Sequence, residues 1–125
     1  MIPYARQNIT QADIDAVTEV LRSDFLTQGQ IIPRFEKIIA NYVGAKHAVA
    51  VSNATSALHV ACLALGLKAG ETLWTSPITF VASANCGLYC GAEVDFVDID
   101  VQTYNICPKA LAKKLEQAKI AGKLP

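Results

Sequence analysis

Apolar residues in the first third of the chain recur at helical spacing and predict two helices. Thr10 and Asp13 form a start typical of a capping box, and a first apolar stripe follows at Ile14, Val17 and Leu21. The polar segment 23–29 interrupts this periodicity and predicts a loop. A second stripe, spaced by four, three and four residues, predicts a helix that Gly44 ends; its members are Ile31, Phe35, Ile38 and Tyr42.

After residue 47 short apolar runs alternate with helical patterns. The runs predict strands at 48–51, 72–75 and 93–97, and the helical patterns cover 55–65, about 79–89 and a segment that begins at Pro108. This order predicts an α/β fold with parallel strands and right-handed crossovers. The helices are rich in small residues, which indicates close packing on a sheet. The two opening helices lie outside this alternation, like an arm.

Composition and charge narrow the classes of function. The chain has 125 residues, enough for one compact domain, and 52% of them are hydrophobic. Its 11 basic and 11 acidic residues are scattered, so nothing favours nucleic-acid binding. No signal-peptide pattern and no run of membrane-spanning length is found, and we expect a cytoplasmic protein without membrane contact.

The cysteines are expected to be small, reduced and buried rather than metal-bound. Cys86 and Cys90 would share one helix face and could hold a metal together. No further ligand stands at a suitable spacing, so a metal site is not favoured there, nor at Cys62 or Cys107.

A polar turn follows each predicted strand, and parallel strands bring such turns to one edge of a sheet. The turn at 52–56 opens a helix, where free backbone N–H groups either bind a phosphate or are merely capped by Ser, Asn and Thr. Neither a GxGxxG nor a GxxxxGK[ST] motif occurs, which argues against a dinucleotide fold and a P-loop. In the turn at 75–80, Phe80 either stacks on a flat ring or belongs to the core. Asp98 and Asp100 either bind a metal or act as acid and base, or else shape a turn.

These segments together resemble the sugar aminotransferases of the DegT/DnrJ/StrS group. The resemblance rests on Leu26–Gly29, Phe35-Glu36, Val43–Ala48, Ser52–Leu58, Thr75–Asn85, Phe96–Asp100 and Thr103–Ile106, in this order. It covers essentially the whole chain. Within the group, the sequence of these segments is most similar to that of members that aminate UDP-linked 4-keto sugars on the way to pseudaminic acid.

The resemblance implies the fold and the site. It implies an α/β/α sandwich with a mainly parallel sheet, the large domain of fold-type I enzymes that use pyridoxal 5'-phosphate (PLP), usually as homodimers with glutamate as amino donor. Residues 1–30 would form a helical arm and an active-site loop, and residues 31–125 the first part of the PLP-binding domain. Implied binding residues are, for the cofactor, Ala54, Thr55 (phosphate) and Phe80 (ring), and, for the nucleotide-sugar substrate, Tyr4, Thr27 and Gln28.

The chain departs from the family in one respect. The lysine that carries PLP, and the aspartate that holds its pyridine nitrogen, match no position of this sequence, so no catalytic residue is assigned. We therefore expect the N-terminal piece of an aminotransferase, inactive by itself. Two alternatives stay open: a PLP-dependent sugar dehydratase of the same family, and a short non-catalytic binding protein.

Overall fold

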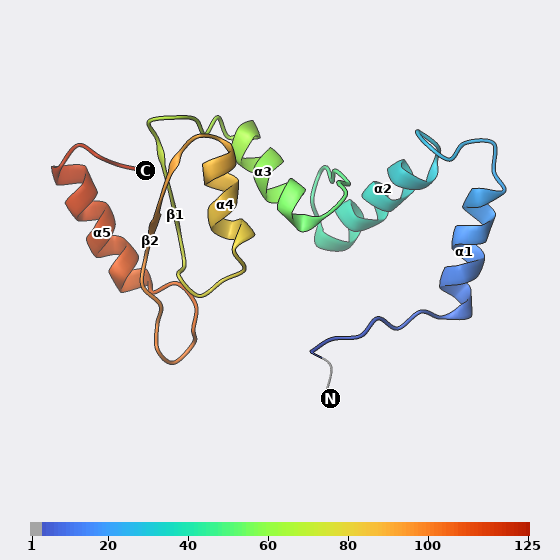
Figure 1. Cartoon of the computed structure of the whole chain (residues 1–125), viewed down its shortest axis with the longest axis horizontal. Helices are drawn as coiled ribbons and strands as arrows, with labels where there is room; N and C mark the ends of the chain where they lie inside the picture. Colours follow the sequence, from blue (N-terminus) through green and yellow to red (C-terminus); the bar gives the residue numbers. More distant parts are fainter. Residues whose placement is uncertain (1–3) are drawn as a thin grey trace. The chain divides into compact units, whose positions relative to one another are not determined.

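The computed structural model describes residues 4–125, which form two compact units, residues 4–50 and Val51–Pro125 (Figure 1). The first unit contains the helices α1 (Gln11–Leu21) and α2 (Ile31–Val43). The second contains α3 (Ala54–Ala64), β1 (Thr72–Thr75), α4 (Ala82–Tyr89), β2 (Glu93–Phe96) and α5 (Pro108–Ile120). The division into residues 1–30 and 31–125 stays a prediction. None of the helices found in residues 4–125 is both long and apolar enough to cross a membrane.

The first unit confirms both predicted opening helices. The Asp13 carboxylate accepts hydrogen bonds from the N–H and the hydroxyl of Thr10, each at 2.7 Å, which closes the start of α1. Gly44 follows α2 in the left-handed conformation at φ 70°, where a glycine has no Cβ to strain. A groove between the helices is lined by apolar side chains such as Val17, Phe35 and Ile38.

The predicted strand at 48–51 is wrong for this structure. The segment has no ladder partner among the described residues, and a β-strand needs one to satisfy its N–H and C=O groups. Instead, the Ala50 N–H donates to Oε1 of Glu36 on α2 over 2.8 Å. The Glu36 carboxylate therefore holds the chain just before the polar turn at 52–56.

Glu36 is expected to be a structural acceptor that alanine cannot replace. Glu36→Ala leaves the half-buried Ala50 N–H unpaired and should destabilise the first unit by about 1–2 kcal/mol. Glu36→Gln keeps an acceptor oxygen and should cost less. Hydrogen exchange at the Ala50 amide, with Lys37→Ala as exposed control, measures the difference. Equal exchange in Glu36→Ala and the unmodified chain would contradict this assignment.

The second unit confirms an α/β fold with parallel strands, although its sheet has two strands rather than three. β1 pairs with β2 in parallel, and Leu73 lies opposite Val94 while Trp74 lies opposite Asp95. Because side chains alternate along a strand, these two pairs point to opposite faces of the sheet.

Helix α4 covers the face that carries Leu73 and Val94. A Cβ built on Gly87 would lie 3.0 Å from Leu73 Cβ and 3.1 Å from Val94 Cγ2, so any side chain there would force these neighbours to shift. The buried residues of this layer are small or β-branched: Ala82, Cys86, Ala92 and Val97. Helix α4 is therefore rich in small residues because it lies so close to the sheet that larger side chains have little room.

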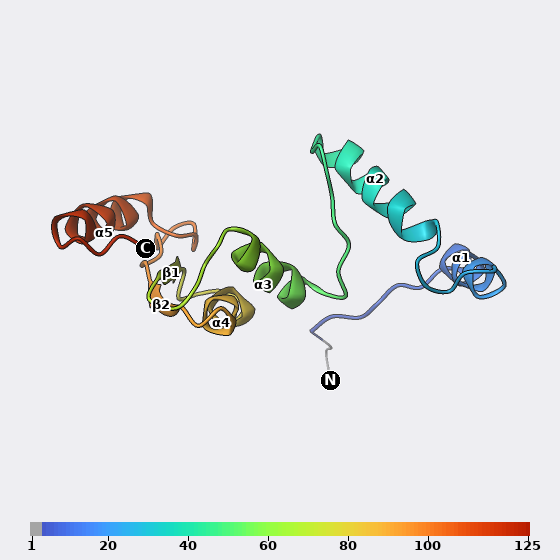
Figure 2. The ribbon, with the colours of Figure 1, turned by 90° about the horizontal axis from the view of Figure 1, so that it is seen from above.

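Helix α5 lies on the other face, as the two perpendicular views show (Figures 1 and 2). Lys114 Nζ contacts Asp95 Oδ2 at 2.5 Å, donates to the Phe96 carbonyl at 2.6 Å, and lies 4.9 Å from the centre of the Trp74 ring. Helices therefore lie on both faces of the sheet, in agreement with the expected α/β/α arrangement.

The Lys114–Asp95 pair makes a prediction about pH. The hydrogen bond from Lys114, followed by that from the Phe96 N–H, lowers the pKa of the Asp95 carboxyl below its ordinary value of 3.8. Because the pKa of Asp95 is lower in the folded chain than in the unfolded chain, the ionised carboxylate stabilises the fold at pH values above the unfolded-state pKa. This stabilisation is lost as the pH falls through the folded-state pKa. Lys114→Met should raise the pKa of Asp95 in an NMR titration, whereas Lys113→Met, one residue earlier on α5, should not. A pKa unchanged by Lys114→Met would refute the pairing.

Cys62, Cys86 and Cys90 lie near one another where α3 packs on α4, whereas Cys107 is the N-cap of α5; only Cys86 is fully buried. Burial raises the pKa of the Cys62 thiol to about 11, and the neighbouring Cys86 and Cys90 add to the effect. Cys62, Cys90 and Cys107 are half-buried, which differs from the expectation that all four are enclosed. All four are free thiols, and the raised pKa of Cys62 makes that thiol unreactive.

Candidate functional site

The carboxyl edge of the sheet brings several polar turns together. Figure 1 shows the N-terminal ends of α3 and α4 on the same side of the second unit as the carboxyl ends of β1 and β2. In open α/β sheets, ligands bind outside this edge. The segments that follow the strands are therefore the candidates for chemistry.

The N-terminus of α3 has the properties of an anion site. Asn53 is the N-cap, and its side chain accepts from the Ser56 N–H at 2.9 Å, while the Ala57 N–H donates to the Asn53 carbonyl. The cap leaves the N–H groups of Ala54 and Thr55 without an acceptor among the described residues. The Thr55 side chain is half-buried beside them. Capping and phosphate binding are thus compatible here, because the cap satisfies one donor and leaves two.

Phe80 lies outside the helix that was predicted to contain it. Helix α4 begins at Ala82 and not near Thr79, and Phe80 is 69% exposed in the preceding turn. The physical reason lies in Ser76, whose hydroxyl lies 3.4 Å from both the N–H and the carbonyl of Ile78 and so favours a local turn over a helix. The role of Phe80 toward a ring stays a prediction.

The turn after β2 explains the acidic pair. Asp98 Oδ1 accepts from the Ile99 N–H at 2.8 Å, and Asp100 Oδ1 accepts from the N–H groups of Gln102 and Thr103 at 3.0 Å each. These backbone donors lower the pKa of the Asp100 carboxyl below 3.8. Both carboxylates therefore shape a turn. No group of three or more His, Cys, Asp or Glu residues in the described part of the chain is arranged to hold a metal ion.

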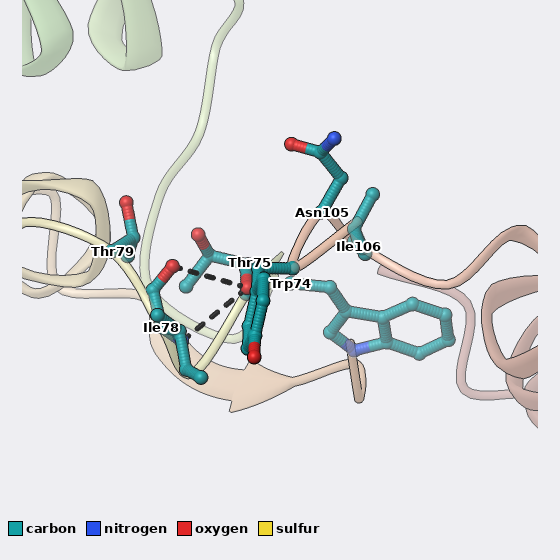
Figure 3. Close-up of a pocket in the computed structure, with 8 residues that line it drawn as sticks. Trp74, Thr75, Ile78, Thr79, Asn105 and Ile106 are labelled. Atoms are coloured by element: carbon teal, nitrogen blue, oxygen red, sulfur yellow. Dashed lines mark hydrogen bonds between the residues drawn. The ribbon is translucent and has the colours of Figure 1, made fainter. Parts of the chain in front are cut away.

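Sequence reasoning missed a pocket beside this turn. It has a volume of about 380 Å³ and lies between the end of β1 and the segment 104–106 (Figure 3). An antiparallel bridge between Ile99 and Ile106 holds that segment in place. Nothing in the local sequence marks a bridge of only one residue pair, so the proximity of the two segments could not be predicted.

The residues implied for the substrate lie in the first unit. Tyr4 and Thr27 are exposed, and Gln28 adopts a left-handed conformation with φ 58°. A Cβ on Gly29 would lie 3.0 Å from the Phe25 carbonyl oxygen, so the loop is tightly folded. A left-handed non-glycine residue stores strain and is enriched at functional sites, and the sequence gives no sign of it. The roles of Tyr4, Thr27 and Gln28 stay predictions.

Comparisons with known proteins identify the family. The model of the DegT/DnrJ/EryC1/StrS aminotransferase family matches residues 7–121. The chain belongs to this family. The chain is 47% identical over 115 residues to a UDP-4-amino-4,6-dideoxy-N-acetyl-beta-L-altrosamine transaminase of Campylobacter jejuni, a match that covers 92% of the chain and 30% of the relative. It is 44% identical to the spore coat polysaccharide biosynthesis protein SpsC of Bacillus subtilis, covering 88% of the chain and 28% of that protein.

Solved structures agree with this family assignment. The chain superimposes on an aminotransferase from Psychrobacter cryohalolentis with a TM-score of 0.81 and 37% identity, over 89% of this chain and 29% of that one. With PseC of Helicobacter pylori, an aminotransferase involved in the biosynthesis of pseudoaminic acid, the TM-score is 0.82 at 35% identity, over 89% and 30%. The chain spans about 30% of the length of the curated relatives it matches.

Proposed function

We propose that this chain forms the phosphate- and ring-binding part of a PLP-dependent aminotransferase that acts on a UDP-linked 4-keto sugar, with glutamate as amino donor. The observation that carries the proposal is the start of α3, where two unpaired N–H groups and the half-buried Thr55 side chain converge at the carboxyl edge of the sheet. Family membership supports the choice of PLP, and the names of the relatives support a sugar substrate in polysaccharide biosynthesis.

The donors present suit a phosphate group. Ala54 and Thr55 would hold it through their N–H groups and the Thr55 hydroxyl, aided by the positive end of the α3 dipole. The exposed Phe80 would lie against the ring and shield it from water. When bound, PLP supplies an electron sink for the carbon that gains or loses the amino group. The chain's own contribution is thus to anchor and orient.

The contacts to the substrate and the lysine that carries the cofactor would lie outside the start of α3. Tyr4, Thr27 and Gln28 would contact the nucleotide sugar, and a second subunit would complete the site of a homodimer. Lys114 is committed to Asp95 and Phe96, on the sheet face opposite α4, and is unsuited to carrying the cofactor. The relatives are about three times as long as their matched segment, and the proposal places the cofactor lysine outside that segment.

The test uses protein produced from the complete reading frame that contains this sequence. Purified protein should bind PLP, and added glutamate should convert the bound cofactor to its amine form, seen as a change in visible absorbance. A keto-sugar nucleotide should restore the original spectrum. Binding without conversion by any amino acid would overturn the aminotransferase proposal, and loss of water from the sugar would then point to a dehydratase.

A further inference from the structure

The two edges of the sheet differ in how their backbone groups are occupied. In the second strand, the N–H groups of Glu93 and Val97 donate at 2.9 Å each to carbonyls in β1 and directly before it. In a parallel pair, successive residues of a strand direct their backbone groups alternately toward the partner and away from it. The backbone groups on the outer edge of β2 are therefore those of Val94 and Phe96.

Side chains occupy both backbone groups of Phe96 on this outer edge. Its N–H donates to Asp95 Oδ1 at 2.7 Å, and its carbonyl accepts from Lys114 Nζ at 2.6 Å. The same ammonium group contacts the second carboxylate oxygen of Asp95 at 2.5 Å. The Lys114 side chain is only 24% exposed, and its Nζ also lies 4.9 Å from the centre of the Trp74 ring. The ammonium group is thus held at the edge from three sides.

The outer edge of β1 has no such closure. Thr72 and Trp74 direct their backbone groups away from β2. In the part of the chain that the structure describes, the side-chain hydrogen bonds near the sheet go to other residues and not to these two. The closure is therefore particular to β2.

We propose that Lys114, positioned by Asp95, closes the outer edge of β2 and so prevents a second copy of this chain from pairing with it. An unpaired strand edge is a template for another chain, and a lysine side chain is one means of blocking it. A second copy is the partner to be excluded, because two identical edges can pair with each other about a twofold axis. An incoming strand would have to displace the ammonium group from both a carboxylate and a carbonyl.

The test uses protein from the complete reading frame and measures its assembly state by sedimentation velocity. Lys114→Met removes the ammonium group and keeps an unbranched side chain, so this variant should form a larger, concentration-dependent assembly than the unmodified protein. Lys113→Met makes the same change at an exposed position of α5 and should leave the assembly state as it was. A Lys114→Met variant that assembles like the unmodified protein overturns the proposal, and so does a larger assembly of Lys113→Met.

Two further measurements separate edge pairing from a general loss of stability. The Val94 N–H lies on the outer edge, and its hydrogen exchange should slow by about tenfold as Lys114→Met assembles, because it gains an acceptor. Gly87→Ala disturbs the packing of α4 on the sheet but keeps Lys114, so its assembly state should not change. Assembly of Lys114→Met without protection at Val94, or equal assembly of Gly87→Ala, contradicts the proposal. None of these results depends on the proposed transamination.

Discussion

Gly87→Val is expected to destabilise the second unit by about 2–3 kcal/mol, since overpacking a close-packed layer forces its neighbours to move. Even a single Cβ at this position would meet Leu73 Cβ and Cδ2 at 3.0 Å and Val94 Cγ2 at 3.1 Å. Both neighbours are on the sheet, where the parallel pairing of Leu73 with Val94 holds their backbones in place. The two extra methyl groups of valine therefore have no space without separating α4 from the sheet.

Chemical denaturation of the full chain measures this loss of stability. A control variant separates the effect of valine on helix propensity from its effect on packing. Ala112→Val, on the exposed side of α5, introduces the same β-branched residue into a helix and should cost about 0.5 kcal/mol. Gly87→Ala should be intermediate, because its better helix propensity offsets part of the steric cost. If Gly87→Val were no more destabilising than Ala112→Val, α4 would not pack on the sheet as described.

The fold was predictable where the pattern is local. Both opening helices, the Thr10–Asp13 start and the Gly44 end follow from residues near one another, and the parallel pairing of β1 with β2 follows from the strand–helix–strand order. The structure of segment 48–51 was not predictable, because a strand forms only with a pairing partner and an apolar run does not reveal whether one is present. There, the carboxylate of Glu36, 14 residues away, satisfies the Ala50 N–H in its place.

The candidate site was predictable only in part, for related reasons. Capping residues and an aromatic ring after two strands point to the carboxyl edge, and the structure shows Asn53 capping α3 and Phe80 exposed there. The pocket at Tyr104 depends on a one-pair bridge and a left-handed backbone. Neither leaves a periodic signal, and tyrosine is an unusual choice for such a conformation.

Ala54→Pro and Thr55→Val should each weaken binding of the cofactor's phosphate by roughly tenfold, because a hydrogen bond to a charged group contributes about 1.5–3 kcal/mol. Ala54 is the first residue of α3, where proline is tolerated, and Asn53 before it is extended at φ −167° and ψ 169°, a conformation that proline favours in its neighbour. Ala54→Pro therefore deletes one N–H and leaves the helix intact. Thr55→Val removes the hydroxyl and keeps the shape.

The measurement should separate binding of the cofactor's phosphate and ring from covalent attachment of its aldehyde to a lysine. 4'-Deoxypyridoxine 5'-phosphate has the ring and phosphate of PLP but no aldehyde, so its affinity for the protein from the complete reading frame depends on the cradle alone. Gln11→Pro, at the first position of α1, and Thr18→Val, also on α1, are the matched controls and should bind normally. Unchanged affinity in both α3 variants, with helix content preserved by circular dichroism, would mean that the free N–H groups of Ala54 and Thr55 are merely solvated. The start of α3 would then be an ordinary capped helix, and the phosphate would have to be held elsewhere.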